Sequence, residues 1–225
     1  MILYASMSST ELRAIRFYLE SSNISCCYYD LDTGNKEETK ASLLRKNPSG
    51  IVPFLEDSDN IVLGTVPILL YLAETHANFA MCGKTLEDRA KVESVLMWAS
   101  ASLARSVFYD FAAPRLHESH SIGEFESIHL VTHGKSEIIE HFDVLEKHYL
   151  NNNNNNTKYL VNNELTLADV YTAITISFLE PLLFDFSPWP GLCKWFEGIK
   201  SAIAQTSQKN MLTRLLSFNR TTVAV

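Results

Sequence analysis

Cysteine and histidine are the residue types of this sequence best suited to hold a metal or to act as nucleophile and base. The four cysteines form no Cys-x-x-Cys pair and stand at no metal-ligand spacing from any of the seven histidines. His129 and His133 are four positions apart, which could hold a metal on a helix, but no third acidic or thiol ligand accompanies them. We therefore expect reduced packing thiols, surface histidines and no metal site.

Serine hydroxyls gather near the N-terminus, where an apolar segment gives way to a helical pattern. Ser8 and Glu11 form an S-x-x-E capping pattern, which predicts Ser8 as the cap of a helix and Ser9 in its first turn. Serines are common at helix starts for structural reasons alone. From their spacing, Ser6, Ser8 and Ser9 are therefore both candidate hydroxyl donors and candidate capping residues.

The composition limits the classes of protein to which this chain can belong. Its 225 residues are 46% hydrophobic, 20% charged and 11% aromatic, which excludes a disordered chain, a collagen-like repeat and a disulfide-dense miniprotein. A formal net charge of -7 argues against a nucleic-acid-binding protein. The sequence has no apolar run of about 18 residues and no secretory signal pattern, so we expect a cytoplasmic protein without membrane insertion.

The first part of the chain alternates between strand and helix patterns, and these elements must position the serines. Apolar stretches predict strands, while apolar positions at helical spacing, such as Leu12, Ile15 and Leu19, predict helices. The expected strands cover residues 2–5, 26–31, 52–55 and 61–63, and the expected helices cover 10–22, 33–45 and 66–75. The acidic segment 56–60 predicts a hairpin between the last two strands. This order predicts one parallel crossover followed by one hairpin in a single small sheet.

The rest of the chain shows helical patterns without strands. Thr166 and Asp169 form a second capping pattern, with Asp in place of the usual Glu, at the start of an apolar helix. Six consecutive asparagines at 151–156 predict a surface loop between helices. The sequence therefore predicts a small α/β domain at 1–76, a linker at 77–85 and an all-helical domain at 86–225.

Motifs along the whole chain resemble those of the cytosolic glutathione transferase superfamily. Residues 47–55 (NPSGIVPFL) resemble its NPxGxVPxL signature, residues 62–72 (VLGTVPILLYL) resemble the segment that follows, and residues 166–169 (TLAD) resemble its (S/T)xAD motif. Residues 90–98 are similar to the theta-like, serine-type classes. The resemblance implies an α/β thioredoxin-like N-terminal domain and an all-α C-terminal domain. It further implies a homodimeric detoxification enzyme that conjugates glutathione, its co-substrate, to small hydrophobic electrophiles without a metal.

The same resemblance implies a serine that stabilises the glutathione thiolate. Anchored on Arg13, the matching position is Ser9. Ser8 or Ser6 is an alternative, and a site without a catalytic serine is another. Tyr4 lies within the first expected strand and matches the position used by tyrosine-type classes less well.

The resemblance also implies the residues that bind glutathione, which are Val52, Pro53, Thr65, Lys46 and Asn47. Val52 and Pro53, joined by a cis bond, would present backbone to the cysteinyl unit. Thr65 would hold the γ-glutamyl carboxylate. Lys46 and Asn47 lie where theta-like members place residues near the glycyl carboxylate, although a solvated lysine explains Lys46 as well.

The sequence departs from the family pattern at Gly64, where an acidic or amide residue usually engages the γ-glutamyl ammonium. Loss of a charge-assisted hydrogen bond of about 1.5–3 kcal/mol predicts glutathione binding that is about ten- to a hundredfold weaker. Gly64→Glu is expected to tighten binding, unless Gly64 adopts a positive φ. The departure leaves open a function of another class, a non-catalytic scaffold with this fold in a larger complex.

A hydrophobic electrophile requires an apolar pocket in the helical domain. Phe108, Tyr109 and Phe111 follow a long helical pattern and could line such a pocket. Packing in the core explains these three aromatic side chains equally well.

Overall fold

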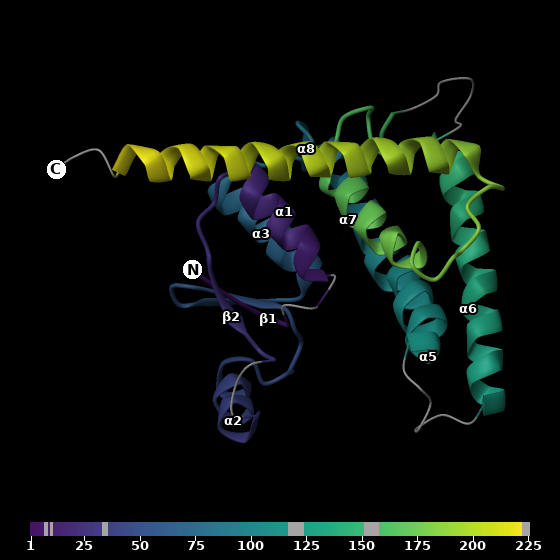
Figure 1. Cartoon of the computed structure of the whole chain (residues 1–225), viewed down its shortest axis with the longest axis horizontal. Helices are drawn as coiled ribbons and strands as arrows, with labels where there is room; N and C mark the ends of the chain where they lie inside the picture. Colours follow the sequence, from purple (N-terminus) through teal and green to yellow (C-terminus); the bar gives the residue numbers. More distant parts are fainter. Residues whose placement is uncertain (7–8, 10, 33–35, 117–123, 151–157, 222–225) are drawn as a thin grey trace. The chain divides into compact units, whose positions relative to one another are not determined.

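The computed structural model describes residues 1–6, 9, 11–32, 36–116, 124–150 and 158–221 (Figure 1). The chain forms two compact units, one of residues 1–80 with the chain from Lys200 onward, and one of Met81–Ile199. This division into compact units differs from the predicted domain limits of 1–76, 77–85 and 86–225, which remain a prediction. The first unit contains the sheet and the predicted site residues.

A four-stranded mixed sheet is the centre of the first unit. Its strands are β1 (Ile2–Ala5), β2 (Cys27–Asp30), β3 (Phe54–Asp57) and β4 (Asn60–Leu63), in the order β2-β1-β3-β4. β1 pairs parallel with β2 and antiparallel with β3, and β3 pairs antiparallel with β4. The predicted parallel crossover followed by a hairpin is therefore confirmed.

Helices cover both faces of this sheet. α1 (Glu11–Ser21) and α3 (Thr65–His76) pack against each other over one face, and α2 (Lys36–Lys46) lies on the other (Figure 1). Leu3 and Leu55, paired across β1 and β3, are fully buried on the face of α1 and α3. Because side chains alternate along a strand, Tyr4 and Phe54 point to the face of α2, where their rings stack with centroids 4.4 Å apart.

The strand directions bring the starts of α1 and α3 together. β1 and β4 both run antiparallel to β3, so they point the same way and end at the same edge of the sheet. The pairing aligns Tyr4, Phe54 and Leu63 in one row near that edge. Because α1 follows β1 and α3 follows β4, both helices begin there. The segment that leads into β3 enters at the same edge.

The second unit is built from helices. α4 (Leu86–Trp98) continues through π-helical turns at Ala99–Leu103 and Ser106–Ala112 into α5 (Ala113–Leu116). α6 (Glu124–Val144) ends in a π-helical segment at Leu145–Leu150, and α7 (Leu167–Ile176) ends in a 3-10 turn at Ser177–Leu179. α8 (Pro190–Thr221) begins in this unit. The predicted helical character is confirmed, while the asparagines at 151–156 lie outside the described residues.

The predicted capping pattern at the start of α7 is confirmed and forms a buried polar network. The Asp169 carboxylate is fully buried and accepts bonds from the Thr166 amide (2.9 Å) and the Thr166 hydroxyl (2.9 Å). It also accepts bonds from the Leu160 amide (2.8 Å) and the Trp195 indole (2.9 Å). Burial raises the pKa of Asp169, and these four donors act in the opposite direction. The network ties the segment before α7 and the first turns of α8 to one carboxylate.

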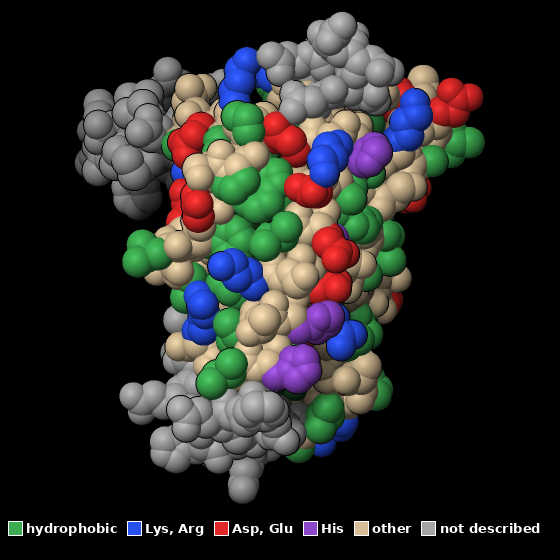
Figure 2. Space-filling view, turned by 90° about the vertical axis from the view of Figure 1, so that its right-hand side faces the viewer, with side chains coloured by type: hydrophobic (Ala, Val, Ile, Leu, Met, Phe, Trp, Pro, Cys, Tyr) green, Lys and Arg blue, Asp and Glu red, His purple; other side chains and the backbone are tan. Residues whose placement is uncertain are grey.

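The described surface shows no sign of a metal site or a membrane span. His129 and His133 are exposed, and the described residues contain no group of three or more His, Cys, Asp or Glu side chains that could hold a metal. No helix in the described part of the chain is both long and apolar enough to cross a bilayer. On the face shown in Figure 2, acidic and basic side chains are interspersed, so no basic surface dominates that face.

Candidate functional site

The edge of the sheet where α1 and α3 begin collects most of the predicted site residues. Ser9 lies between β1 and α1, Val52 and Pro53 precede β3, and Thr65 opens α3. The Gly64 amide donates to the Pro53 carbonyl (2.8 Å), which fastens the start of α3 to the segment before β3. The fold therefore brings Ser9, the Val52–Pro53 segment and Thr65 to one edge.

Ser9 lies between the end of β1 and the start of α1. Its amide donates to the Ser6 carbonyl (3.0 Å), and its half-buried hydroxyl has no partner among the described residues. The Ser6 hydroxyl, in contrast, donates to the Asp32 carboxylate (2.6 Å). Ser8, and with it the predicted capping box with Glu11, lies outside the described residues. Ser9 is thus the described serine of this edge whose hydroxyl is available to a ligand.

The Val52–Pro53 bond is cis. Asn47 is buried and holds the preceding loop, since its Nδ2 donates to the Ile51 carbonyl (2.7 Å) and its Oδ1 accepts from the Ser49 hydroxyl (2.8 Å). Among the described residues, none hydrogen-bonds the Val52 backbone, and Val52 is about half exposed. Asn47 therefore shapes the loop that presents Val52, and both ends of its own amide are used within the loop.

Lys46 is bound to the sheet. Its ammonium lies 2.7 Å from the Glu56 carboxylate and 3.2 Å from the Tyr4 hydroxyl, and the Tyr4 hydroxyl donates to Glu56 (2.6 Å). The Lys46 and Tyr4 hydrogen bonds lower the pKa of Glu56, and burial with the Glu56 hydrogen bond raises the pKa of Tyr4. The structure thus places Lys46 and Tyr4 on the face of α2, with their polar groups engaged by Glu56. A glycyl carboxylate at Lys46 would have to compete with Glu56.

The start of α3 combines an unusual backbone with an unsatisfied hydroxyl. Gly64 caps the helix with φ 86 and ψ 156, a conformation that is essentially restricted to glycine. Thr65 is only 7% exposed, and its hydroxyl makes no hydrogen bond of normal geometry to a described residue. The first turn of α3 holds no acidic residue. A helix N-terminus with free amides, a partial positive charge and an unpaired hydroxyl is suited to bind a carboxylate.

Glu11, the first residue of α1, is a residue of this edge that the sequence motifs did not single out as a ligand. Its carboxylate lies beside the Thr65 hydroxyl. Burial raises the pKa of Glu11, and the polar Thr65 hydroxyl beside the carboxyl partly opposes that rise. In the sequence Glu11 is explained as the capping partner of Ser8. The signal that could have found it is topological, because α1 and α3 follow strands that end at one edge.

The conformation of Gly64 makes a prediction about stability. Gly64→Ala is expected to lower the free energy of unfolding by about 1–3 kcal/mol, because a Cβ is strained at this φ and ψ. Crowding is not the reason, since the added Cβ would meet Pro67 and Ile51 only at 3.8 and 3.9 Å. The same strain burdens Gly64→Glu. Urea titration followed by circular dichroism measures the loss.

Gly198→Ala is the matched control for Gly64→Ala. Gly198 lies inside α8 with ordinary backbone, and apart from its chain neighbours and the backbone of its own helix no atom lies within 4 Å of its added Cβ. Alanine there should stabilise the protein by about 0.5–1 kcal/mol. A Gly64→Ala protein as stable as the parent would contradict the assignment of strain to residue 64.

The aromatic residues proposed for a substrate pocket pack in different ways. Phe111 is buried against Phe184, Phe108 meets Phe178 edge to face with centroids 4.8 Å apart, and Tyr109 is 68% exposed. Core packing therefore accounts for Phe108 and Phe111.

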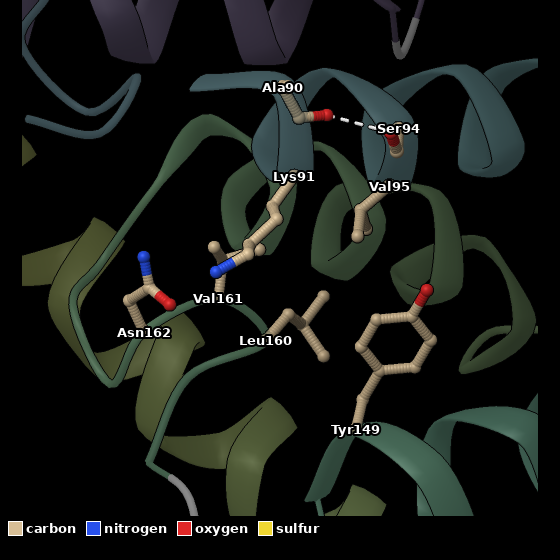
Figure 3. A pocket seen from close by; sticks show the side chains of 8 residues that line it. All are labelled: Ala90, Lys91, Ser94, Val95, Tyr149, Leu160, Val161 and Asn162. Atoms are coloured by element: carbon tan, nitrogen blue, oxygen red, sulfur yellow. Dashed lines mark hydrogen bonds between the residues drawn. The ribbon is translucent and has the colours of Figure 1, made fainter. Parts of the chain in front are cut away.

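A pocket of about 350 Å³ lies elsewhere in the helical unit, between α4, Tyr149 and the loop that contains Leu160. Figure 3 shows Val95, Leu160 and the Tyr149 ring on one side of this pocket, with Lys91 and Asn162 on the other. The Ser94 hydroxyl at its rim donates to the Ala90 carbonyl (2.7 Å).

Comparison with known proteins gives the family context of this geometry. Residues 3–80 match the family model of the glutathione S-transferase N-terminal domain, and residues 109–202 match that of the C-terminal domain. The chain is 28% identical over 170 residues to a dichloromethane dehalogenase of Methylophilus leisingeri, a match that covers 73% of this chain and 61% of that protein, less than two thirds of its length. It is 25% identical to glutathione S-transferase theta-1 of Rattus norvegicus, over 90% of this chain and 83% of the relative.

Solved structures of glutathione transferases share the fold of this chain. The structure of the Bombyx mori glutathione transferase BmGSTD1 superposes with a TM-score of 0.78 at 18% identity, over 93% of this chain and 91% of that chain. Together with the family models and the observed sheet, this confirms the predicted fold class, a thioredoxin-like α/β part followed by an all-α part.

Proposed function

Because this chain belongs to the glutathione S-transferase family, we propose that it conjugates glutathione to small hydrophobic electrophiles. One observation carries the proposal, the buried and unpaired Thr65 hydroxyl at the N-terminus of α3. An unsatisfied buried hydroxyl is uncommon unless a ligand supplies its partner. The γ-glutamyl carboxylate of glutathione is such a partner, and the amides at the start of α3 would share its charge.

The remaining residues of the edge have roles in this proposal that follow from their positions. The exposed Val52 backbone before Pro53 has no described hydrogen-bond partner, so it is available to pair with the cysteinyl unit like an added strand. Ser9 then lies at the start of α1, where its hydroxyl can donate to the sulfur of glutathione. Asn47 supports the site by holding the loop before Val52 through its hydrogen bond to the Ile51 carbonyl. Lys46 supports it through the ion pair that joins the end of α2 to Glu56 in the sheet.

The chemistry is a nucleophilic attack by sulfur. A free thiol has a pKa of about 8.5, and a hydroxyl donor together with a helix N-terminus favours its thiolate. The thiolate forms the C–S bond, and the electrophile either releases its leaving group or takes up a proton after addition. The site contributes orientation and a lowered thiol pKa, and no enzyme-bound covalent intermediate or metal is needed. The name of the bacterial relative suggests dichloromethane as a first electrophile to assay.

Thr65→Val tests the proposed carboxylate contact. Valine has the shape of threonine without the hydroxyl, so we expect glutathione binding to weaken about tenfold or more. Stability should stay the same or rise, because the Thr65 hydroxyl has no well-formed partner in the free protein. Isothermal titration calorimetry with glutathione and a melting curve measure the two effects. Equal affinity in both proteins would remove Thr65 from the site.

The scaffold alternative predicts a different result in the same titration. A non-catalytic protein with this fold would bind neither free glutathione at millimolar concentration nor a glutathione resin, and elution by free glutathione would release nothing.

Two further proposals, a homodimer and a cytoplasmic location, follow from the family. Sedimentation equilibrium tests the first, and a fluorescent fusion viewed in cells tests the second.

A further inference from the structure

We infer that Glu11 binds the ammonium of the γ-glutamyl unit of glutathione, in place of an acidic side chain at position 64. The inference rests on the proposed function and adds a specificity-determining residue to it. Its basis is the juxtaposition of two groups at the starts of two neighbouring helices. They are the Glu11 carboxylate, which has no described cation beside it, and the Thr65 hydroxyl, which is buried without a hydrogen bond of normal geometry.

The topology fixes this juxtaposition. β1 and β4 end at the same edge of the sheet, α1 and α3 pack side by side, and Glu11 and Thr65 are the first residues of these helices. Glu11 is half-buried and Thr65 is buried, so neither residue is fully exposed to solvent. The Thr65 hydroxyl lies near enough to the Glu11 carboxyl to oppose the rise of its pKa.

The charges at this edge are incomplete without a ligand. No described cation forms an ion pair with Glu11, and burial raises the pKa of its carboxyl. Two other acids near the edge already have partners, because Asp32 accepts the Ser6 hydroxyl and Asp30, at the end of β2, accepts the Asp32 amide. Position 64 cannot supply a carboxylate without backbone strain, because Gly64 has φ 86.

A ligand with a carboxylate and an ammonium on one carbon satisfies both groups at once. Its carboxylate would lie on the Thr65 hydroxyl and the amides of α3, and its ammonium would lie on Glu11. The γ-glutamyl unit of glutathione has this arrangement. Carboxylic acids that lack the amino group would leave Glu11 without a cation and should therefore bind less well.

Two other roles for Glu11 predict results that differ from this one. A carboxylate beside the Thr65 hydroxyl could compete with the ligand carboxylate, in which case its removal would tighten binding. An acid in the first turn of α1 could also serve only the helix dipole, in which case its removal would change stability and leave ligand discrimination intact.

The test uses two ligands and two forms of the protein. Glutathione and its des-amino analogue, glutaryl-cysteinyl-glycine, are titrated by calorimetry into the wild-type protein and into Glu11→Gln, which keeps the size of the side chain. We expect wild type to bind glutathione at least about tenfold more tightly than the analogue. In Glu11→Gln this ratio should fall to near one, mainly through weaker binding of glutathione. Glu74→Gln, an exposed acid on α3, is the matched control and should keep the wild-type ratio.

Each result bears on the inference. An unchanged ratio in Glu11→Gln overturns it, and tighter binding of both ligands overturns it in favour of competition. Failure of wild type to bind either ligand rejects the proposed function and the inference together, which separates that case from the first two. Melting curves check the fold, and if Glu11→Gln does not fold, Glu11→Asp replaces it, because a carboxylate one methylene shorter should give an intermediate ratio.

Discussion

Asp169→Ala is expected to lower the free energy of unfolding by about 3–5 kcal/mol, because it removes the buried carboxyl group that accepts hydrogen bonds from four donors. The variant leaves the amides of Thr166 and Leu160 and the indole of Trp195 buried without their acceptor. It also removes the capping box that starts α7. Since the donors come from the segment before α7, from its cap and from α8, the loss should loosen all three parts of the helical unit.

Urea titration of wild type and variant measures this loss as a shift of the midpoint at unchanged slope. Asp88→Ala is the matched control, because Asp88 forms the equivalent capping box with Thr85 at the start of α4 in a partly exposed position. Its loss should be much smaller. The stability loss from Asp169→Asn should lie between the losses from Asp88→Ala and Asp169→Ala. An amide keeps one acceptor oxygen but turns two N–H groups toward donors. Equal losses from Asp169→Ala and Asp88→Ala would show that capping alone explains Asp169.

The features that could be predicted from the sequence are those set by neighbours along the chain. The pairing of Thr166 with Asp169 spans one helical turn, and an S/T-x-x-acid pattern before an apolar run specifies it locally. The order of strands and helices, with an acidic turn between the last two strands, restricts the sheet to one parallel crossover and one hairpin. The fold class follows from such local signals taken in order.

The parts of the candidate site that could not be predicted depend on contacts between distant segments or on a single backbone angle. The pairing of Lys46 with Glu56 and Tyr4 follows from where α2 ends on the sheet, which no local pattern encodes. The φ of Gly64 is set by how the chain turns from β4 into α3. From the sequence alone, this glycine could be interpreted only as the absence of the usual acidic residue. Glu11 lies far from Thr65 in sequence, and only the shared direction of β1 and β4 brings the two together.

Ser9→Ala is expected to reduce turnover of a small electrophile such as dichloromethane by about 10- to 100-fold, while glutathione affinity stays within a few-fold. The reason is that the Ser9 hydroxyl should act on sulfur, and a hydrogen bond to a charged group contributes about 1.5–3 kcal/mol. The Thr65 hydroxyl, the Val52 backbone and Glu11 would still hold the peptide. Steady-state rates and a glutathione titration of the same preparation separate the two effects.

The pH profile distinguishes this role of Ser9 from a purely structural one. Without the hydroxyl, the pKa of the bound thiol should rise toward its free value of about 8.5, and because the thiolate reacts, the rate midpoint should move to higher pH. The ratio of wild-type to variant rates should therefore shrink as pH increases. Ser6→Ala is the control, because the Ser6 hydroxyl already donates to Asp32, and Ser8→Ala tests the competing serine. A folded Ser9→Ala protein with an unshifted profile and full turnover would remove Ser9 from the mechanism, and a shift produced by Ser8→Ala instead would assign the thiolate donor to Ser8.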